Sequence, residues 1–207
     1  MVSLSAKHLV TISGVHGVGK TSLLMHAQKR LGGISLIDRP KNPFQTPFEA
    51  MLFFVASFSQ RDRLINQQSG LTWCDRWAMH DIAVYAWTLF ELGHLSRLEA
   101  EAIVRALRRS ESFGVRPDVA ILIDDEPEAI LSRIEQYRKP SPHHIFERDK
   151  EFISALRIHF LARFRDLVSK KKQRIFIVAV NNRPACDVAE EAILEVRRLL
   201  YNKDRHE

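Results

Sequence analysis

The chain has 207 residues, of which 45% are hydrophobic, a length and composition that suit one domain with a substantial core. No apolar run is long enough to cross a bilayer and the N-terminus shows no signal-peptide pattern, so we expect no membrane contact and a cytoplasmic location. The net charge of +6 is spread along the chain without a long basic block, which argues against a nucleic-acid partner.

Five short apolar runs alternate with helical patterns along the chain. The runs are His8–Ile12, Ile34–Ile37, Leu71–Cys74, Val119–Ile123 and Arg174–Val180. This alternation predicts an α/β fold, with a five-stranded parallel sheet and helices on both faces, in a single domain over residues 1–207. Ligands of such sheets bind beyond the carboxyl ends of the strands, so the residues after each run are the candidates for function.

The first run leads into SGVHGVGKT at residues 13–21. Gly14, Gly19, Lys20 and Thr21 satisfy the pattern G-x-x-x-x-G-K-[ST]. Glycines let backbone N–H groups converge on phosphate oxygens, Lys20 supplies charge for the β- and γ-phosphates, and the Thr21 hydroxyl suits a phosphate-bound Mg²⁺. The loop therefore predicts binding of ATP and Mg²⁺. The predicted cradle consists of Gly14, Val15, His16, Gly17, Val18, Gly19, Lys20, Thr21 and Ser22.

An acidic and a basic residue follow the third apolar run. Asp75 and Arg76 come directly after LTWC, and Trp77 begins a long amphipathic pattern. An acid there can orient Mg²⁺ or accept a hydroxyl proton, and a guanidinium can neutralise charge on a transferring phosphoryl group. Ligands bind where the carboxyl ends of the parallel strands meet, which we call the strand-end rule. Since this rule places the pair next to Lys20, we predict these roles for Asp75 and Arg76. A local ion pair at a helix N-terminus is the alternative.

Later signals set helix boundaries and one loop. Ser96 and Glu99 form a capping-box pattern that predicts a helix to about Ser112. The segment RKPSPHHIFER, residues 138–148, has two prolines and no periodicity, and we predict a mobile loop there.

Two cysteines, Cys74 and Cys186, are too few for a disulfide framework or a zinc site, so we expect both to be small core residues.

Three segments together resemble the deoxynucleoside kinase and thymidylate kinase superfamily of P-loop kinases. They are GVHGVGKTSL, CDRW and PDVAILIDDEPEAILSRI, and the resemblance runs from about His8 to Arg165 with the motifs in the same order and spacing. NPF, PFEAMLFFVASFSQRDRL and DRWAMHDIAVYAWTLFELGHLS are similar to segments of bacterial-type deoxynucleoside kinases. The resemblance implies a phosphotransferase that moves the γ-phosphoryl group of ATP to a (deoxy)nucleoside-type acceptor.

The resemblance also implies a general base, which accepts a proton from the acceptor, and a lid over ATP. In the deoxynucleoside kinase branch an acid after the second strand takes the proton of the 5′-hydroxyl, and Asp38 is the nearest candidate. The family typically has Glu directly before Pro, whereas this chain has Asp38-Arg39-Pro40. An arginine-rich lid, here at about 138–148, closes over the ATP phosphates in the family. Its candidate cations are Arg133, Arg138, Lys139 and Arg148.

The adenine site is implied at the loop NNRP, after the last strand. Asn181 and Asn182 can supply polar contacts there and Arg183 a planar surface for stacking, although these are also ordinary turn residues. For Arg133 a surface salt bridge is the rival role. For His16 a solvated or backbone-bonded side chain is the rival to a catalytic one.

The acceptor is the least determined part of the hypothesis. An ungapped match places Phe54 where deoxynucleoside kinases carry a base-binding Gln, and Ser57 where thymidylate kinases carry an Arg for the monophosphate. Gln60, Arg61 and Arg63 could substitute after a shift in register, or they line an exposed helix face. Phe53, Phe54 and Phe58 could form an aromatic wall for a base, which favours a nucleoside acceptor.

The sequence thus predicts a small-molecule nucleoside or nucleotide kinase that uses ATP and Mg²⁺. The first alternative is a thymidylate-kinase-like nucleoside monophosphate kinase. The second is a nucleotide-binding regulator or weak ATPase without a small acceptor. A homodimer is left open.

Overall fold

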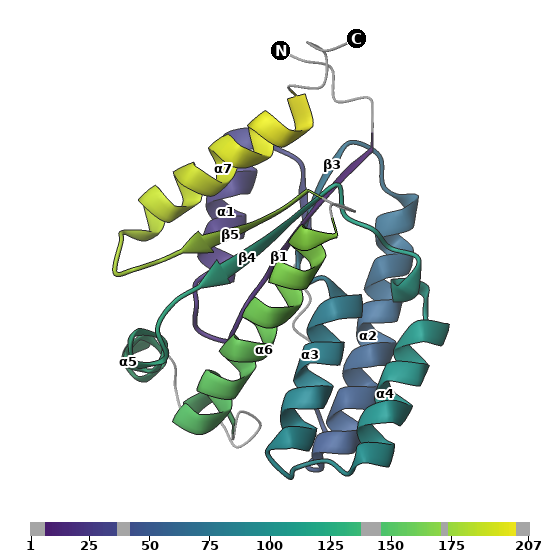
Figure 1. The fold of residues 1–207 in the computed structure, drawn as a ribbon. Helices are drawn as coiled ribbons and strands as arrows, with labels where there is room; N and C mark the ends of the chain where they lie inside the picture. The colour runs from purple at the N-terminus through teal and green to yellow at the C-terminus, as the bar shows by residue number, and fades with distance from the viewer. Residues whose placement is uncertain (1–6, 37–41, 138–145, 171–173, 202–207) are drawn as a thin grey trace.

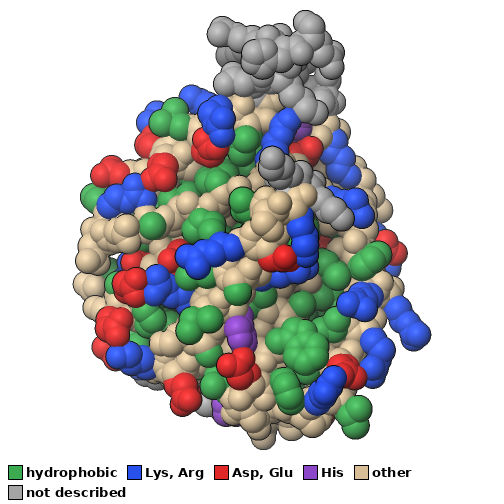
Figure 2. Space-filling model, in the orientation of Figure 1, with side chains coloured by type: hydrophobic (Ala, Val, Ile, Leu, Met, Phe, Trp, Pro, Cys, Tyr) green, Lys and Arg blue, Asp and Glu red, His purple; other side chains and the backbone are tan. Residues whose placement is uncertain are grey.

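The computed structural model describes residues 7–36, 42–137, 146–170 and 174–201. It has an α/β fold in which helices cover both faces of a parallel sheet, as the sequence predicts (Figure 1). None of the helices within these ranges is long and apolar enough to cross a membrane. Lys and Arg side chains are scattered among acidic ones over the face that Figure 2 shows.

The sheet has the strand order β2-β3-β1-β4-β5, and every neighbouring pair is parallel. Four strands have five or six residues, whereas β2 at the edge has three. The strands are β1 His8–Ser13, β2 Ile34–Leu36, β3 Leu71–Asp75, β4 Val119–Asp124 and β5 Arg174–Ala179. Strand β1 is central in this order, and its residues, like those of β3 and β4, are almost all buried, as is typical of a parallel sheet covered on both faces.

The helices form two layers. Helix α1 packs against α7 on one face, and α3 packs against both α4 and α6 on the other, where α2 also lies (Figure 1). One continuous core joins the sheet to both layers. The helices are α1 Lys20–Leu31, α2 Pro47–Gln67, α3 Ala78–Glu91, α4 Arg97–Arg109, α5 Pro127–Tyr137, α6 Lys150–Ser169 and α7 Ala185–Tyr201, with a 3₁₀ turn η1 at Glu111–Phe113.

Two local predictions can be compared with these bounds. The capping box at Ser96 and Glu99 is present, but α4 ends at Arg109, before the predicted Ser112, and a 3₁₀ turn follows. Cys74 is buried as predicted. The prediction for Cys186 was wrong, because this residue is exposed in the first turn of α7, where the helix faces solvent.

The sheet order brings the candidate site together. Strands β3 and β1 are neighbours with Ile12 opposite Asp75, and β1 pairs with β4 on its other side. The segments that follow these three strands therefore leave the sheet at one edge, as the strand-end rule requires.

Candidate active site

The phosphate loop joins β1 to α1 and needs glycine at two positions. Gly14 has a φ of +139°, and a Cβ atom there would lie 2.5 Å from the carbonyl oxygen of Ile123. Gly17 has a φ of +76°, and its Cβ would lie 2.6 Å from Cγ1 of Ile134. Both the positive φ and the crowding disfavour a side chain, so these glycines determine the path of the loop.

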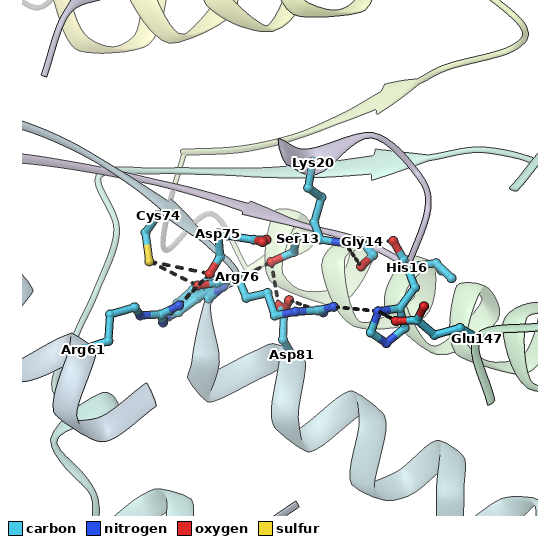
Figure 3. Close-up of polar contacts among 12 residues, drawn as sticks. Ser13, Gly14, His16, Lys20, Arg61, Cys74, Asp75, Arg76, Asp81 and Glu147 are labelled. Atoms are coloured by element: carbon cyan, nitrogen blue, oxygen red, sulfur yellow. Dashed lines mark hydrogen bonds and ion pairs between the residues drawn. The ribbon is translucent and has the colours of Figure 1, made fainter. Parts of the chain in front are cut away.

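Lys20 opens α1 and lies against the loop. Its Nζ donates to the carbonyl oxygens of Gly14 at 3.0 Å and Val15 at 2.8 Å, and the side chain is buried (Figure 3). Gly19 is the N-cap of α1 and brings no side-chain cap, and the first turn contains no acid. The start of the helix thus combines N–H groups that no cap side chain covers with a fixed ammonium, which suits an anionic phosphate.

The other predicted cradle residues contribute in different ways. The side chains of Val15 and Val18 are buried in the core, so only their backbone groups can meet a ligand. Thr21, in the first turn of α1, is half-buried, and Ser22 beside it is exposed.

Asp75 is a buried acid at the end of β3. Within the described part of the chain, its Oδ1 has no hydrogen-bond partner although the atom is buried. Figure 3 shows the carboxylate on the side of Ser13 and Lys20. A buried carboxylate oxygen without a partner is costly, and a ligand that supplies one, such as a cation or a hydroxyl, would relieve that cost.

Arg76 adopts a left-handed backbone with a φ of +74°, which is rare for a residue with a side chain. Its guanidinium lies 3.5 Å from Asp81 Oδ2, 3.4 Å from His16 Nδ1, and 5.0 Å from the centre of the Tyr85 ring. Burial lowers the pKa of Arg76, but Tyr85 together with Asp75 and Asp81 outweighs burial and raises the pKa above its ordinary value. Arg76 forms an ion pair with Asp81 in the first turn of α3, so the alternative role, a local ion pair at a helix N-terminus, is present here with Asp81 as the partner.

Asp81 is a site residue that the sequence did not reveal. It lies in the first turn of α3, is 1% exposed, and accepts a 2.6 Å hydrogen bond from the hydroxyl of Ser13. Burial raises its pKa to about 6, although Arg76 and Ser13 oppose the rise. An acid in the first turn of a largely apolar helix was the available signal.

His16 links the loop to a second unexpected acid, Glu147. The His16 Nδ1 lies 3.1 Å from Glu147 Oε1, and its ring packs edge-on against Tyr85 with centroids 5.3 Å apart. Glu147 is buried, although it follows a segment rich in proline and histidine. His16 is therefore half-buried between Arg76 and Glu147, which excludes the simply solvated role.

Arg133 reaches the phosphate loop from α5. Its Nε donates to the carbonyl oxygen of Gly17 at 3.3 Å, and its NH2 group is 2.5 Å from Asp125 Oδ2. The rival role, a salt bridge, is therefore present, although its acid is buried and the Arg133 side chain is only 29% exposed. Arg133 thus lies at the rim of the loop with its charge paired to Asp125.

The remaining predicted residues either follow β5 or lie outside the described part of the chain. Asp38 and Arg138 lie outside the described residues, as does Lys139. Asn182 is exposed and has a φ of +59°, as expected for a turn. Arg183 is held by Glu191 and by the carbonyl oxygens of Ala179 and Val180, so its position after β5 is fixed.

Comparisons with known proteins show what the chain and its fold are similar to. No protein-family model matches the chain. The deoxyadenosine/deoxycytidine kinase of Bacillus subtilis is 28% identical over 141 residues, which cover 62% of this chain and 64% of that protein. The deoxyadenosine kinase of Dictyostelium discoideum is 31% identical over 143 residues, which cover 64% of this chain and 57% of that protein. The matches thus span less than two thirds of either relative.

Solved structures extend the likeness to the whole fold. A deoxyadenosine kinase from M. mycoides, described with the products dCMP and a flexible dCDP, aligns with a TM-score of 0.79 and 14% identity over 91% of this chain and 98% of that one. Its dATP-bound form gives a TM-score of 0.76 with 14% identity over 91% and 99% of the two chains. The resemblance to the deoxynucleoside kinase superfamily is confirmed. It rests on sequence in the two relatives and on fold alone in the solved structures.

Proposed function

We propose that the chain is an ATP-dependent deoxynucleoside kinase with a single kinase domain over residues 1–207. One observation carries the proposal: Asp75, whose buried Oδ1 has no hydrogen-bond partner among the described residues, and the cation Arg76 lie at the end of β3, directly beside the phosphate loop at the end of β1. A site that only held a nucleotide would need the loop but not this pair. The names of the two sequence relatives support the same reaction class.

The phosphate side of the reaction follows from the loop. Lys20 and the first turn of α1 would hold the β- and γ-phosphates, and Arg133 adds charge at the rim. As the reaction proceeds, Arg76 would neutralise charge on the transferring group. These residues would position the phosphates and neutralise their negative charge, and these two effects are most of what phosphoryl transfer requires.

Mg²⁺ is the expected cofactor, and the residues suit it. The Thr21 hydroxyl and the Asp75 carboxylate are both oxygen donors, and the buried Asp75 Oδ1 lacks a partner within the described ranges. Mg²⁺ is usually held by one or two protein groups together with phosphates and water. When bound, the ion would neutralise charge on the phosphates.

The acceptor side favours an uncharged nucleoside. Phe44, Phe53, Phe54 and Phe58 form a row in which successive ring centroids are 6.0, 5.8 and 6.2 Å apart. Phe58 is buried and has Arg61 over its ring, so the half-buried rings of Phe53 and Phe54 would offer the surface for stacking a base. Since the sequence relatives are named for deoxyadenosine and deoxycytidine, we propose a deoxynucleoside of this class as the acceptor. Asp38 would accept the 5′-hydroxyl proton, and the lid at 138–148, with Arg138, would close over ATP.

The adenine, partner and location assignments also stay predictions. Asn182 and Arg183 would contact the adenine of ATP. The partners would be small nucleosides or nucleotides, without nucleic acid or membrane, in the cytoplasm and with a homodimer left open.

The deciding experiment measures ADP release from ATP and Mg²⁺ with a panel of deoxynucleosides, deoxynucleoside monophosphates and no acceptor. We expect ADP release that depends on a deoxynucleoside. Dependence on monophosphates alone would favour the thymidylate-kinase-like alternative, and ADP release without any acceptor would favour the weak ATPase.

A further inference from the structure

Arg61 makes an unusual set of contacts with the turn that carries Asp75 and Arg76. Its NH1 donates to the carbonyl oxygen of Asp75 at 2.6 Å, and its NH2 donates to the carbonyl oxygen of Arg76 at 3.3 Å (Figure 3). Arg61 lies on α2, 14 positions before Asp75 in the chain. A side chain of one helix thus donates to two consecutive carbonyl groups, that of the last residue of β3 and that of the residue after it.

The guanidinium is held from its other side as well. Its Nε and NH2 donate to Oδ1 of Asp62 at 2.9 and 2.8 Å, and the guanidinium carbon lies 4.5 Å from the centre of the Phe58 ring. The side chains of Arg61 and Asp62 are only 5% and 2% exposed. Because each guanidinium nitrogen already donates to the protein and the group is buried, Arg61 is poorly suited to bind an acceptor phosphate.

The turn itself needs support. Arg76 has a φ of +74°, a conformation that costs free energy for a residue with a side chain and persists only where the surroundings impose it. Its own N–H donates to the carbonyl oxygen of Ile12 at 2.8 Å, which fixes the turn to β1. Arg61 fixes the following carbonyl groups, so the turn is held on both sides.

We propose that Arg61 is a positioning residue that imposes the backbone geometry of Asp75 and Arg76. Arg61 acts on the reaction only through these two residues, and Asp62 serves to hold and neutralise it. The catalytic part of this inference rests on the proposed kinase function. Its structural part, that Arg61 holds the turn, does not.

The test uses three variants of the full chain. Arg61→Lys keeps the charge but loses the planar fork that reaches two carbonyls. The double variant Arg61→Met/Asp62→Leu replaces the buried ion pair with apolar side chains, which preserves the fold better than removal of one partner. Arg63→Ala is the matched control, since Arg63 is on the same helix but its side chain is 65% exposed and 4.0 Å from Glu111.

Two readouts separate the outcomes. Amide hydrogen exchange over residues 71–77 should be faster in both Arg61 variants than in the wild type, and unchanged in Arg63→Ala. The kcat for acceptor-dependent ADP release should fall about 100-fold in the double variant, as misplacement of reacting groups by about 1 Å can cause, with the KM for ATP nearly unchanged. Arg61→Lys should give an intermediate kcat.

Wild-type exchange in both Arg61 variants would overturn the inference whatever the activity. A rise in the KM for the acceptor at constant kcat would also overturn it and assign Arg61 to acceptor binding. If the wild type shows no acceptor-dependent ADP release, the proposed function fails, whereas the exchange measurement still decides whether Arg61 holds the turn.

Discussion

The hydroxyl of Ser13 donates a 2.6 Å hydrogen bond to the buried carboxylate of Asp81, and so joins the last residue of β1 to the first turn of α3. The same carboxylate faces Arg76 at 3.5 Å. Asp81 therefore connects the start of the phosphate loop with the cation proposed to act on the transferring phosphoryl group. An ionised Asp81 holds Arg76 more strongly than a protonated one, because only the carboxylate carries charge.

The first prediction is a pH dependence that comes from Asp81. Burial raises its pKa to about 6, so between about pH 5 and pH 7 the group changes from mainly protonated to mainly ionised. We expect kcat to rise with pH through an inflection near 6, and we expect Asp81→Asn to lower kcat and remove that inflection. Profiles of kcat against pH for both proteins test this, and an unchanged inflection in the variant would assign it to another group.

The same shift has the opposite effect on stability. The pKa of Asp81 is higher in the folded protein than its ordinary value of 3.8, so the folded protein binds this proton more tightly than the unfolded chain. The contribution of this group to stability is therefore complete below about pH 4 and is lost as the pH rises through about 6. Urea unfolding of wild type and Asp81→Asn at pH 4 and pH 7 would reveal the difference.

The second prediction concerns Lys20. Lys20→Ala removes the ammonium that lies 3.0 Å or less from two carbonyl oxygens of the loop. We expect nucleotide affinity or turnover to fall by at least about 100-fold, comparable with the loss of one fixed charge-stabilising group, while the fold remains. Titration calorimetry with Mg·ATP and circular dichroism measure the two effects. Lys29→Ala, on the exposed side of α1, is the control and should behave as wild type.

The third prediction separates binding from chemistry at Asp75. If Asp75 organises Mg²⁺ or the acceptor hydroxyl, Asp75→Asn should lower kcat by about 100-fold or more and change the affinity for ATP much less, because the contribution appears in the transition state. Steady-state kinetics with varied Mg²⁺ measure both quantities. Small and equal effects on kcat and affinity would contradict the proposed role.

The sequence predicted the parts of this site that depend on local pattern. The glycine pattern indicated the loop, since Gly14 and Gly17 are needed for their positive φ and for the lack of space for a side chain. Asp75 and Arg76 were predicted as candidates because residues that directly follow the strands of a parallel sheet lie together where ligands bind. The strand positions were right to within about one residue, since short apolar runs between turn residues are well defined.

The missed residues depend on distant packing. Asp81 meets Ser13 across 68 positions of sequence, and its neighbours in α3 give only an apolar helical pattern. Arg61 was expected either on an exposed face or near the acceptor, and its burial depends on the crossing of α2 and the end of β3. Glu147 lies in a segment without hydrophobic periodicity, so the sequence does not predict whether its side chain is buried or exposed.

The last prediction concerns the choice of acceptor. A monophosphate brings about two negative charges, and proteins usually meet them with bidentate arginine. In the helix segment that would line the acceptor site, Arg61 is buried against Asp62 and two carbonyl groups, and Arg63 is 65% exposed beside Glu111. Neither is arranged to meet a phosphate in the site.

The half-buried rings of Phe53 and Phe54 instead suit an uncharged nucleoside, whose base can stack on them and whose sugar carries no phosphate to neutralise. We therefore expect kcat/KM for deoxyadenosine and deoxycytidine to exceed that for the matching monophosphates by at least about 10-fold, which corresponds to about 1.4 kcal/mol in transition-state binding. Phe54→Ala should lower kcat/KM for the nucleosides, whereas Arg63→Ala should leave it unchanged. A consistent preference for the monophosphates would instead require a phosphate-binding cation at the acceptor site, with Arg76 the nearest described candidate, and would favour a thymidylate-kinase-like activity.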